Sequence, residues 1–469
     1  MKSENKNFLY NVVYQLLTFI IPFITVPYIS RVLGVDNVGI YSYTYSIVYM
    51  FMLVAMLGIN NYGNRLIASK RDNPEETAMA FSAVYYLQLT VTLFTIAIYS
   101  IYLLVICHEY KNIAFIQGIF LLSVCFDVNW FFFGIEKFKL TISRNIIVKT
   151  LSLILVFLFV KKPDDLPVYT LIMAGSTLLS QVYLITIIHR YTYFRRISLR
   201  HAFEHFKGVL ILFIPVLAFG IYKVMDKTMI GVLSNVTQLG YYENAEKLMS
   251  IPAAVIAALG TVMLPRMSYL LSRPDSDYKK PIGDSIQLAM KLASIMSAGL
   301  FLISDEVVVI LFGFEFENSA PILRLLSTSI LASAWANVIR TQYLIPLKKD
   351  RIYVVSTVGA AALNFILNIF FIKRYGGVGA CIGTIAAEYF VALYQSFITR
   401  GDLDYKRYLI ILMKELFEAV SIVLVAYFVS KMTSSLLISM LIKIGVSSVL
   451  FFAINIRYIR EDFLGHRSI

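Results

Sequence analysis

Charged side chains inside long apolar segments are the residues of this chain most suited to binding chemistry. Lys223, Asp226 and Lys227 stand at positions i, i+3 and i+4 of an apolar run, so a helix places them on one face. A charge at mid-membrane costs at least about 2.5–3.5 kcal/mol on insertion scales, so such groups usually face a cavity or a partner. Pairing within the trio leaves one positive charge over, which favours contact with a phosphate or an acidic sugar. A closed local ion pair is the alternative interpretation.

Other cations lie singly in apolar runs. The planar fork of arginine binds phosphate oxygens in bidentate fashion, which makes Arg324 and Arg340 candidates for the same anion. Snorkelling to the membrane surface explains Arg340 nearly as well and is an equal alternative for Lys291. Arg31 is also a candidate for substrate binding, although interfacial anchoring is the simpler interpretation.

Two carboxylates are candidates for a lumen acid or a coupling group. Glu388 lies near the middle of its apolar run, where it is neutral, paired with a cation, or a carrier of protons or cations. Glu246 shares a helix face with Glu243 and Lys247, and a rim network solvated by lipid headgroups explains it equally well.

Aromatic residues supply a third kind of contact. Tyr41, Tyr45 and Tyr49 recur at i, i+4 and i+8, so a helix aligns them in a stripe that could stack on sugar rings. Ordinary packing or an interfacial belt is the alternative.

The sequence predicts neither a metal site nor a cofactor. His201, Glu204 and His205 have the order of an inverted zinc-protease signature, but they lie in a basic connection with no obvious third ligand. A phosphate-binding loop with its Walker lysine does not occur, so we predict no nucleotide hydrolysis.

The composition identifies the elements that position these residues. Of 469 residues, 58% are apolar and 15% charged, and the mean hydropathy is +0.73. Soluble domains have about 45–50% apolar and about 25% charged residues. These values exclude a cytosolic enzyme, a disordered polymer and a secreted disulfide scaffold, and they predict an all-α polytopic membrane protein.

The apolar runs predict about fourteen transmembrane helices, at about 20 residues for each crossing. They lie near 8–32, 38–62, 78–106, 112–134, 141–160, 166–189, 207–233, 239–265, 284–304, 319–346, 351–372, 377–399, 407–430 and 435–457. If the N-terminus is inside, the inner loops hold roughly 26 Lys and Arg residues and the outer loops roughly 7. Both termini are therefore expected to be cytoplasmic.

An internal repeat divides the chain. VLGVDNVGIYSY (32–43) aligns with VLSNVTQLGYYEN (232–244) after one inserted residue. We expect two parallel-repeat six-helix lobes at 1–190 and 207–400. Residues 191–206 would form an interfacial cytoplasmic linker, and residues 401–469 would add helices 13 and 14 with a cytoplasmic tail.

Three segments carry a family resemblance. They are IPFITVPYISRVLGVDNVGIYSY (21–43), MDKTMIGVLSNVTQLGYYENAEKL (225–248) and KRYGGVGACIGTIAAE (373–388). With the span count, they make the chain resemble the polysaccharide transporter family, the O-antigen and capsule repeat-unit flippases of the multidrug/oligosaccharidyl-lipid/polysaccharide exporter superfamily. The resemblance implies two bundles around a polar cavity and an undecaprenyl-pyrophosphate-linked oligosaccharide as substrate, moved from the inner to the outer leaflet. The extra helix pair resembles that of lipid II flippases, which leaves the exact glycolipid open.

We therefore expect a flippase without enzymatic activity in a bacterial cytoplasmic membrane, working by alternating access in O-antigen, capsule or exopolysaccharide biosynthesis. Its expected partners are the lipid-linked oligosaccharide, membrane lipids, and a polysaccharide polymerase with chain-length machinery, but no nucleic acid. The alternatives are a cation-coupled multidrug exporter of the same superfamily and a membrane polysaccharide polymerase or ligase. The short outer loops speak against the enzymes.

Overall fold

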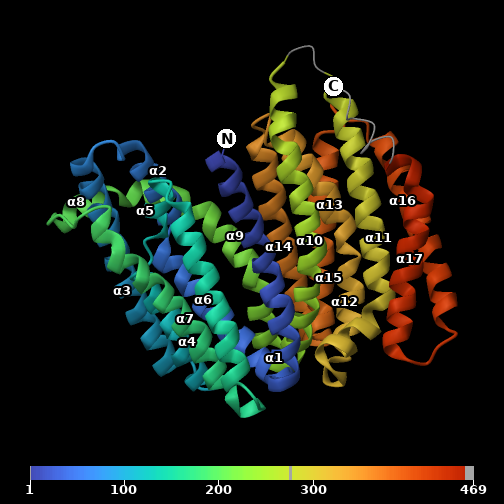
Figure 1. Ribbon diagram of the computed structural model, residues 1–469, viewed down its shortest axis with the longest axis horizontal. Coiled ribbons are helices and arrows are strands. Elements are labelled where there is room, and N and C mark those ends of the chain that lie inside the picture. The colour runs from blue at the N-terminus through green and yellow to red at the C-terminus, as the bar shows by residue number, and fades with distance from the viewer. Residues whose placement is uncertain (1, 274–276, 460–469) are drawn as a thin grey trace. The chain divides into compact units, whose positions relative to one another are not determined.

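The computed structural model describes the backbone of residues 2–273 and 277–459, and the side chains of residues 23–217, 220–273 and 277–456 (Figure 1). Within these residues the chain forms α-helices, short 3-10 helices and one π-helical turn, and no strand. The predicted all-α fold is confirmed. The chain divides into two compact units, unit 1 at residues 1–231 and unit 2 at residues 232–469.

Unit 1 is built around long helices that pack along one another. Its helices are α1 (Lys2–Met56), α2 (Ile59–Lys70), α3 (Pro74–Val105), α4 (Lys111–Val124), α5 (Asn129–Gly134), α6 (Phe138–Phe159), α7 (Leu166–Ile187), α8 (Leu199–Glu204) and α9 (Phe206–Leu233), which ends just past the boundary. α4 packs against both α1 and α7, and α6 packs against α7.

Unit 2 contains the remaining helices. They are α10 (Val236–Leu271), α11 (Lys279–Phe312), α12 (Ser319–Ser327), α13 (Ser329–Ile339), α14 (Asp350–Tyr375), α15 (Gly377–Ile398), α16 (Tyr405–Ser430) and α17 (Leu436–Ile459). α16 and α17 lie side by side at one edge of this unit, drawn in red in Figure 1, and both pack against α11. The six-helix lobes and the linker that the repeat predicts stay predictions.

Fewer helices meet the length and polarity of a membrane span than the sequence predicts. Among the described residues there are 11 such helices, or up to 12 if the bent pair Phe206–Leu217 and Gly220–Leu233 forms one span. The continuous stretch Phe23–Lys70 covers much of the first two predicted spans. The 26-residue α16 is long enough to cross, but Lys414, Glu415 and Glu418 lower its apolar character. The number fourteen therefore stays a prediction.

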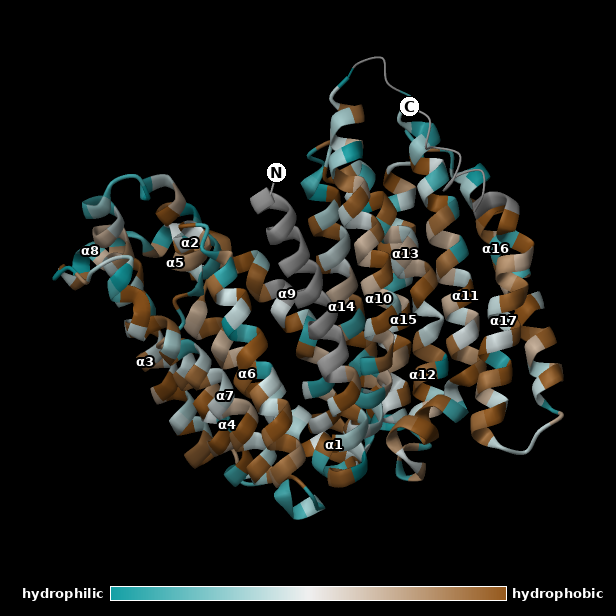
Figure 2. Ribbon diagram, in the orientation of Figure 1, coloured by the Kyte–Doolittle hydropathy of each residue, from teal (hydrophilic) through white to brown (hydrophobic). Residues whose placement is uncertain are grey.

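The surface is that of a protein surrounded by lipid. Large apolar side chains are exposed along the helices, for example Phe94, Leu179 and Phe417. Figure 2 shows helices that are largely hydrophobic along their length and several connecting loops that are hydrophilic. This pattern agrees with the predicted membrane fold, because lipid tails favour apolar side chains on the outer face.

Each unit buries one of the two tryptophans in its core. The indole N–H of Trp130 donates to Gln88 Oε1 at 2.9 Å, and that of Trp335 donates to Ser396 Oγ at 2.9 Å. A buried indole needs such an acceptor, because its N–H would otherwise lose a hydrogen bond on burial.

α1 has a break where the sequence predicts the join between its first two spans. Gly34 has φ 77° and ψ 173°, a conformation essentially restricted to glycine. Asn37 follows the break, and its Nδ2 donates to the backbone oxygens of Leu33 and Pro163, each at 3.0 Å. The side chain therefore ties the break to the turn between α6 and α7.

Gly34→Ala is expected to destabilise the protein by about 1–3 kcal/mol, because alanine is strained at this φ and ψ. The matched control is Gly175→Ala on α7, where an added Cβ meets no atom within 4 Å. That change should leave stability unchanged or raise it by up to about 1 kcal/mol. The measurement is the thermal unfolding midpoint of both variants in detergent. Equal midpoints would contradict the assigned backbone conformation.

Candidate substrate-binding surface

The tyrosine stripe predicted on the second span forms a ladder on α1. The ring centroids of Tyr41 and Tyr45 are 6.0 Å apart with an interplanar angle of 6°, and those of Tyr45 and Tyr49 are 6.1 Å apart at 33°. The four-residue spacing explains this arrangement, because side chains at i and i+4 lie one above the other on a helix. All three side chains are half-buried, so each keeps part of its surface accessible.

Neighbouring helices hold the ladder in place. Phe120 of α4 meets Tyr45 edge-on at 5.2 Å, and Tyr169 of α7 lies 4.9 Å from Tyr41. The side-chain amide of Gln117 also donates to the backbone oxygen of Tyr41 at 3.1 Å. These contacts orient the rings, which a stacking surface for a ring-shaped ligand requires.

α9 approaches the ladder closely because it presents small residues to α1. A side chain at Gly231 would collide with the ring of Tyr43. Thr228 Oγ1 donates to Ser46 Oγ at 2.9 Å, next to the ladder. Small residues and hydroxyl contacts of this kind allow helices to pack closely within a membrane.

Lys223 of α9 brings a positive charge to the end of the ladder. Its Nζ lies 5.9 Å from the ring centroid of Tyr49, within the range of a cation–π contact, and the side chain is exposed. Asp226 and Lys227 follow on the same helix face and are half-buried. Two groups that the sequence predicts independently, the aromatic stripe and the cation, therefore meet within unit 1.

This surface combines two kinds of recognition. Half-buried aromatic side chains can pack against apolar faces of a ligand, and an exposed ammonium binds anionic oxygens. A ligand that carries both sugar rings and a phosphate matches the combination.

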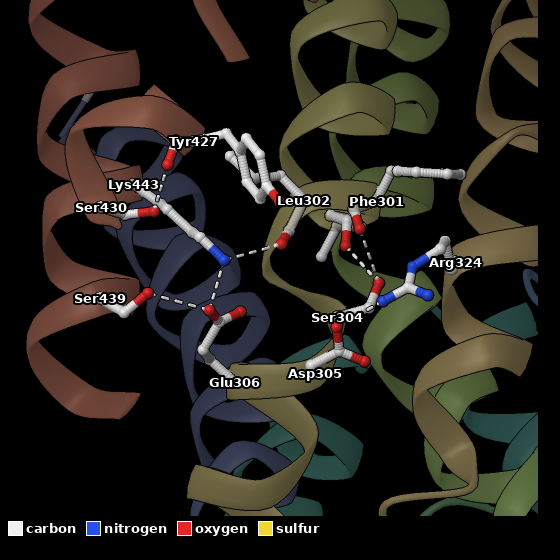
Figure 3. Close-up of polar contacts among 11 residues, drawn as sticks. Phe301, Leu302, Ser304, Asp305, Glu306, Arg324, Tyr427, Ser430, Ser439 and Lys443 are labelled. Carbon is white, nitrogen blue, oxygen red and sulfur yellow. Dashed lines mark hydrogen bonds and ion pairs between the residues drawn. The ribbon is translucent and has the colours of Figure 1, made fainter. Parts of the chain in front are cut away.

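The cationic candidates of unit 2 have other surroundings. Arg324 of α12 pairs with Asp305 of α11 at 2.5 Å, and its guanidinium lies 5.6 Å from the Phe301 ring (Figure 3). Asp305 therefore balances the charge that was predicted to bind substrate phosphate.

Arg340 begins the π-helical turn Arg340–Leu344 that follows α13, and its guanidinium lies 5.7 Å from the ring of Tyr353. π-Helical turns inside α-helical segments often mark functional sites. The substrate role of this arginine stays a prediction.

The remaining single charges are placed as follows. Glu388 of α15 and Glu246 of α10 are half-buried, while the neighbouring Glu243 pairs with Lys247 at 3.2 Å. Arg31 is exposed on α1, close to the Gly34 break. Their proposed functional roles stay predictions.

Lys291 is buried rather than directed to a membrane surface, so snorkelling does not describe it. Its ammonium lies 3.6 Å from Glu415 of α16 and donates to Asn455 of α17. Asn455 in turn donates to Glu418 at 2.5 Å. This polar cluster joins α11 to α16 and α17, which speaks against the predicted contact between Lys291 and substrate.

A second polar cluster lies at the same interface. It was not predicted, because the span expected at 284–304 ends before Glu306 and leaves that residue in an outer loop. α11 continues to Phe312, so Glu306 lies on the helix and is buried there. Its Oε1 accepts hydrogen bonds from Lys443 and from Ser439 at 3.0 Å, and Lys443 also donates to the Leu302 backbone oxygen at 3.3 Å (Figure 3).

Arg144 is a buried arginine of α6 for which the sequence pattern predicted no role. It donates to the Ser180 backbone oxygen at 3.0 Å and to the side-chain oxygens of Gln181, Asn129 and Asn145 at 3.2, 3.1 and 2.7 Å. The sequence signal for this network is a charged residue near the end of a predicted span, here Arg144, together with the amide side chains of Asn129 and Gln181 in two other spans.

The histidines of the basic connection make local contacts. His201 pairs with Glu204 at 3.0 Å, and the His205 ring shares a hydrogen bond with Tyr62 at 2.7 Å. Burial, with a smaller effect of His201, lowers the pKa of His205. Among the described residues, no group of three or more His, Cys, Asp and Glu side chains could hold a metal ion.

Sequence comparison finds relatives along most of the chain. Residues 5–271 match the family described as polysaccharide biosynthesis protein. The chain is 22% identical over 406 residues to an Escherichia coli (strain K12) protein named as an O-antigen transporter, covering 85% of this chain and 97% of that protein. It is 30% identical over 165 residues to a protein of Haloferax volcanii named as the low-salt glycan biosynthesis flippase Agl15, covering 35% of this chain and 34% of that protein.

Two solved structures share the fold. The lipid II flippase MurJ in an inward closed conformation has a TM-score of 0.67 at 17% identity, covering 96% of this chain and 100% of that chain. An inward-facing multidrug resistance transporter of the MATE family has a TM-score of 0.57 at 13% identity, covering 84% and 98%. Both likenesses support the all-helical membrane fold.

Proposed function

The chain belongs to the polysaccharide biosynthesis protein family, and from this membership we propose that it is a flippase for lipid-linked oligosaccharides. It is a multi-pass membrane protein, and its relatives are transporters and flippases rather than enzymes. The substrate that we propose is an undecaprenyl-pyrophosphate-linked repeat unit for O-antigen, capsule or exopolysaccharide. It would move from the inner to the outer leaflet of a bacterial cytoplasmic membrane, with both termini of the chain in the cytoplasm.

The observation that carries this proposal is the meeting of Lys223 with the tyrosine ladder. The ammonium lies 5.9 Å from the Tyr49 ring, at one end of rings spaced about every 6 Å along α1. A sugar chain attached to a pyrophosphate has the same order of features, with ring faces beside a dianionic group. The ladder would stack on the sugars while Lys223 neutralises part of the phosphate charge.

Four other residues predicted from the sequence contribute to the proposed mechanism in different ways. Asp226 and Lys227 continue the cationic face, with Asp226 tuning its charge. Glu388 and Glu246 are candidates for coupling acids, since both are half-buried carboxylates on membrane helices. Alternating access between the two units would carry the headgroup across while the polyprenyl tail stays in lipid, and a polymerase with chain-length machinery would take the product.

A cation-coupled multidrug exporter is the second candidate, because one structural neighbour is a multidrug transporter. Depletion of the protein in its host separates the two functions. A flippase predicts that the surface polysaccharide disappears, that a plasmid copy restores it, and that susceptibility to cationic drugs stays unchanged. Unchanged polysaccharide with increased drug susceptibility would support the exporter and overturn the flippase.

A further inference from the structure

A pocket of about 770 Å³ lies within unit 1 at the start of α6, the end of that helix remote from Gly34. Its polar lining includes Lys137, Lys139, Ser143 and Arg144, and its apolar lining includes Phe138 and Ile147. We propose that this pocket binds the phosphate group of a membrane-anchored lipid. The proposal concerns a site apart from the tyrosine ladder. A phospholipid ligand would be independent of the proposed transport function, whereas a prenyl pyrophosphate ligand rests on it.

The charge of the lining favours an anion. Lys137 and Lys139 are exposed at the pocket, whereas Arg144 is buried. The acidic residue Glu136 also lines it, but its carboxylate pairs with Arg71 of the α2–α3 connection at 2.6 Å. The lining therefore carries three cations. The carboxyl of Asp127 balances the charge of Arg144 and Arg71 engages Glu136, so the two lysines supply the excess positive charge.

Arg144 supplies a preorganised part of the pocket. Its two Nη atoms donate to four neutral oxygens at 2.7–3.2 Å, which fixes the plane of the guanidinium. Because these bonds use all four Nη hydrogens, Arg144 contributes a rigid wall and a fixed positive charge to the pocket rather than a direct hydrogen bond to the anion. The two lysines are exposed at the rim of the pocket, where their ammonium groups can reach a phosphate.

An apolar track leads away from the cations. Ile147 lines the pocket and is 66% exposed, and Leu151, Ile154 and Leu158 continue the same exposed stripe along α6. Their spacing of i, i+4, i+7 and i+11 places them on one helix face. A cationic pocket above an exposed apolar stripe suits a ligand with a phosphate headgroup and a hydrocarbon tail.

The predicted topology places the pocket at the cytoplasmic surface of the membrane. The loop charges assign this end of unit 1 to the cytoplasmic side, where the inner-leaflet phosphates lie. Clusters of Lys and Arg at this level are attracted to anionic headgroups. The phosphate could belong to a glycerophospholipid or to a prenyl pyrophosphate, and these two sources can be separated with soluble short-chain probes.

The test compares two double variants of the full chain purified in detergent. Lys137→Gln with Lys139→Gln removes the exposed cations of the pocket, and Lys161→Gln with Lys162→Gln removes two lysines at the opposite end of α6. Binding of dioctanoyl phosphatidylglycerol and of farnesyl pyrophosphate is measured by titration calorimetry. Losing two charge-assisted contacts should weaken binding at the pocket by at least about tenfold, while the control double variant binds as the wild type does.

Several outcomes would overturn the site. They are unchanged binding by the pocket variant, an equal loss in both double variants, and equally tight binding of the uncharged analogues dioctanoylglycerol and farnesol. A loss confined to the pocket variant supports the proposal for whichever probe shows it. Phosphatidylglycerol then identifies a phospholipid site, and farnesyl pyrophosphate alone identifies a prenyl pyrophosphate site.

Discussion

Lys223→Glu is expected to lower the amount of surface polysaccharide by at least about tenfold, because it replaces attraction for the substrate phosphate by repulsion at the end of the tyrosine ladder. A hydrogen bond to a charged group contributes about 1.5–3 kcal/mol, which corresponds to roughly 10- to 100-fold. Lys223→Arg keeps the charge and should retain most activity. The measurement is surface polymer per cell in a depleted host that carries each variant, normalised to protein in the membrane.

The control is a charge reversal elsewhere on the same helix. Lys207→Glu changes an exposed residue near the start of α9, outside the ladder, and should leave polymer production near the wild-type level. If Lys223→Glu supported normal polymer at normal protein levels, the ladder and its cation would not be the substrate surface.

Breaking the buried pair between Glu306 and Lys443 is expected to have the largest effect on stability. Lys443→Met leaves a carboxylate buried between α11 and α17, and removing one partner of a buried pair typically costs about 3–5 kcal/mol. Replacing both residues, by Glu306→Leu and Lys443→Met, removes the uncompensated charge and should restore most of the lost stability. Thermal unfolding of the wild type, Lys443→Met and the double variant in detergent measures the difference.

The neighbouring residue of α11 supplies a matched control. The side chain of Asp305 is 64% exposed in its pair with Arg324, whereas the Glu306 side chain is 8% exposed (Figure 3). Asp305→Asn should therefore cost no more than about 1 kcal/mol, as exposed pairs do. A double variant that is as unstable as Lys443→Met would show that the uncompensated Glu306 carboxylate is not the cause of the lost stability, and would contradict this prediction.

Local periodicity accounts for what could be predicted from the sequence. The apolar runs predict an all-helical membrane protein, and the four-residue spacing of Tyr41, Tyr45 and Tyr49 predicts their shared face. The glycine in VLGVDN predicts the join at Gly34. Each of these features is determined within one helix or one turn, where spacing along the chain fixes which side chains are neighbours.

Contacts between distant helices could not be predicted in this way. Nothing in the pattern of α9 relates Lys223 to Tyr49, and nothing near Lys291 points to Glu415, because both contacts depend on how separate helices pack. Glu306 was assigned to a loop because hydropathy falls at the acidic residues, whereas Lys443 supplies the partner that allows the helix to continue. A single sequence shows that a buried charge needs a partner but does not identify it.

The most direct test of the flippase proposal is the leaflet distribution of undecaprenyl-pyrophosphate-linked oligosaccharides in host cells depleted of this protein. The proposal predicts that complete repeat units accumulate on the cytoplasmic side while surface polymer disappears, and that a wild-type copy but not Lys223→Glu reverses both changes. Complete units that reach the outer leaflet at the normal rate would contradict it.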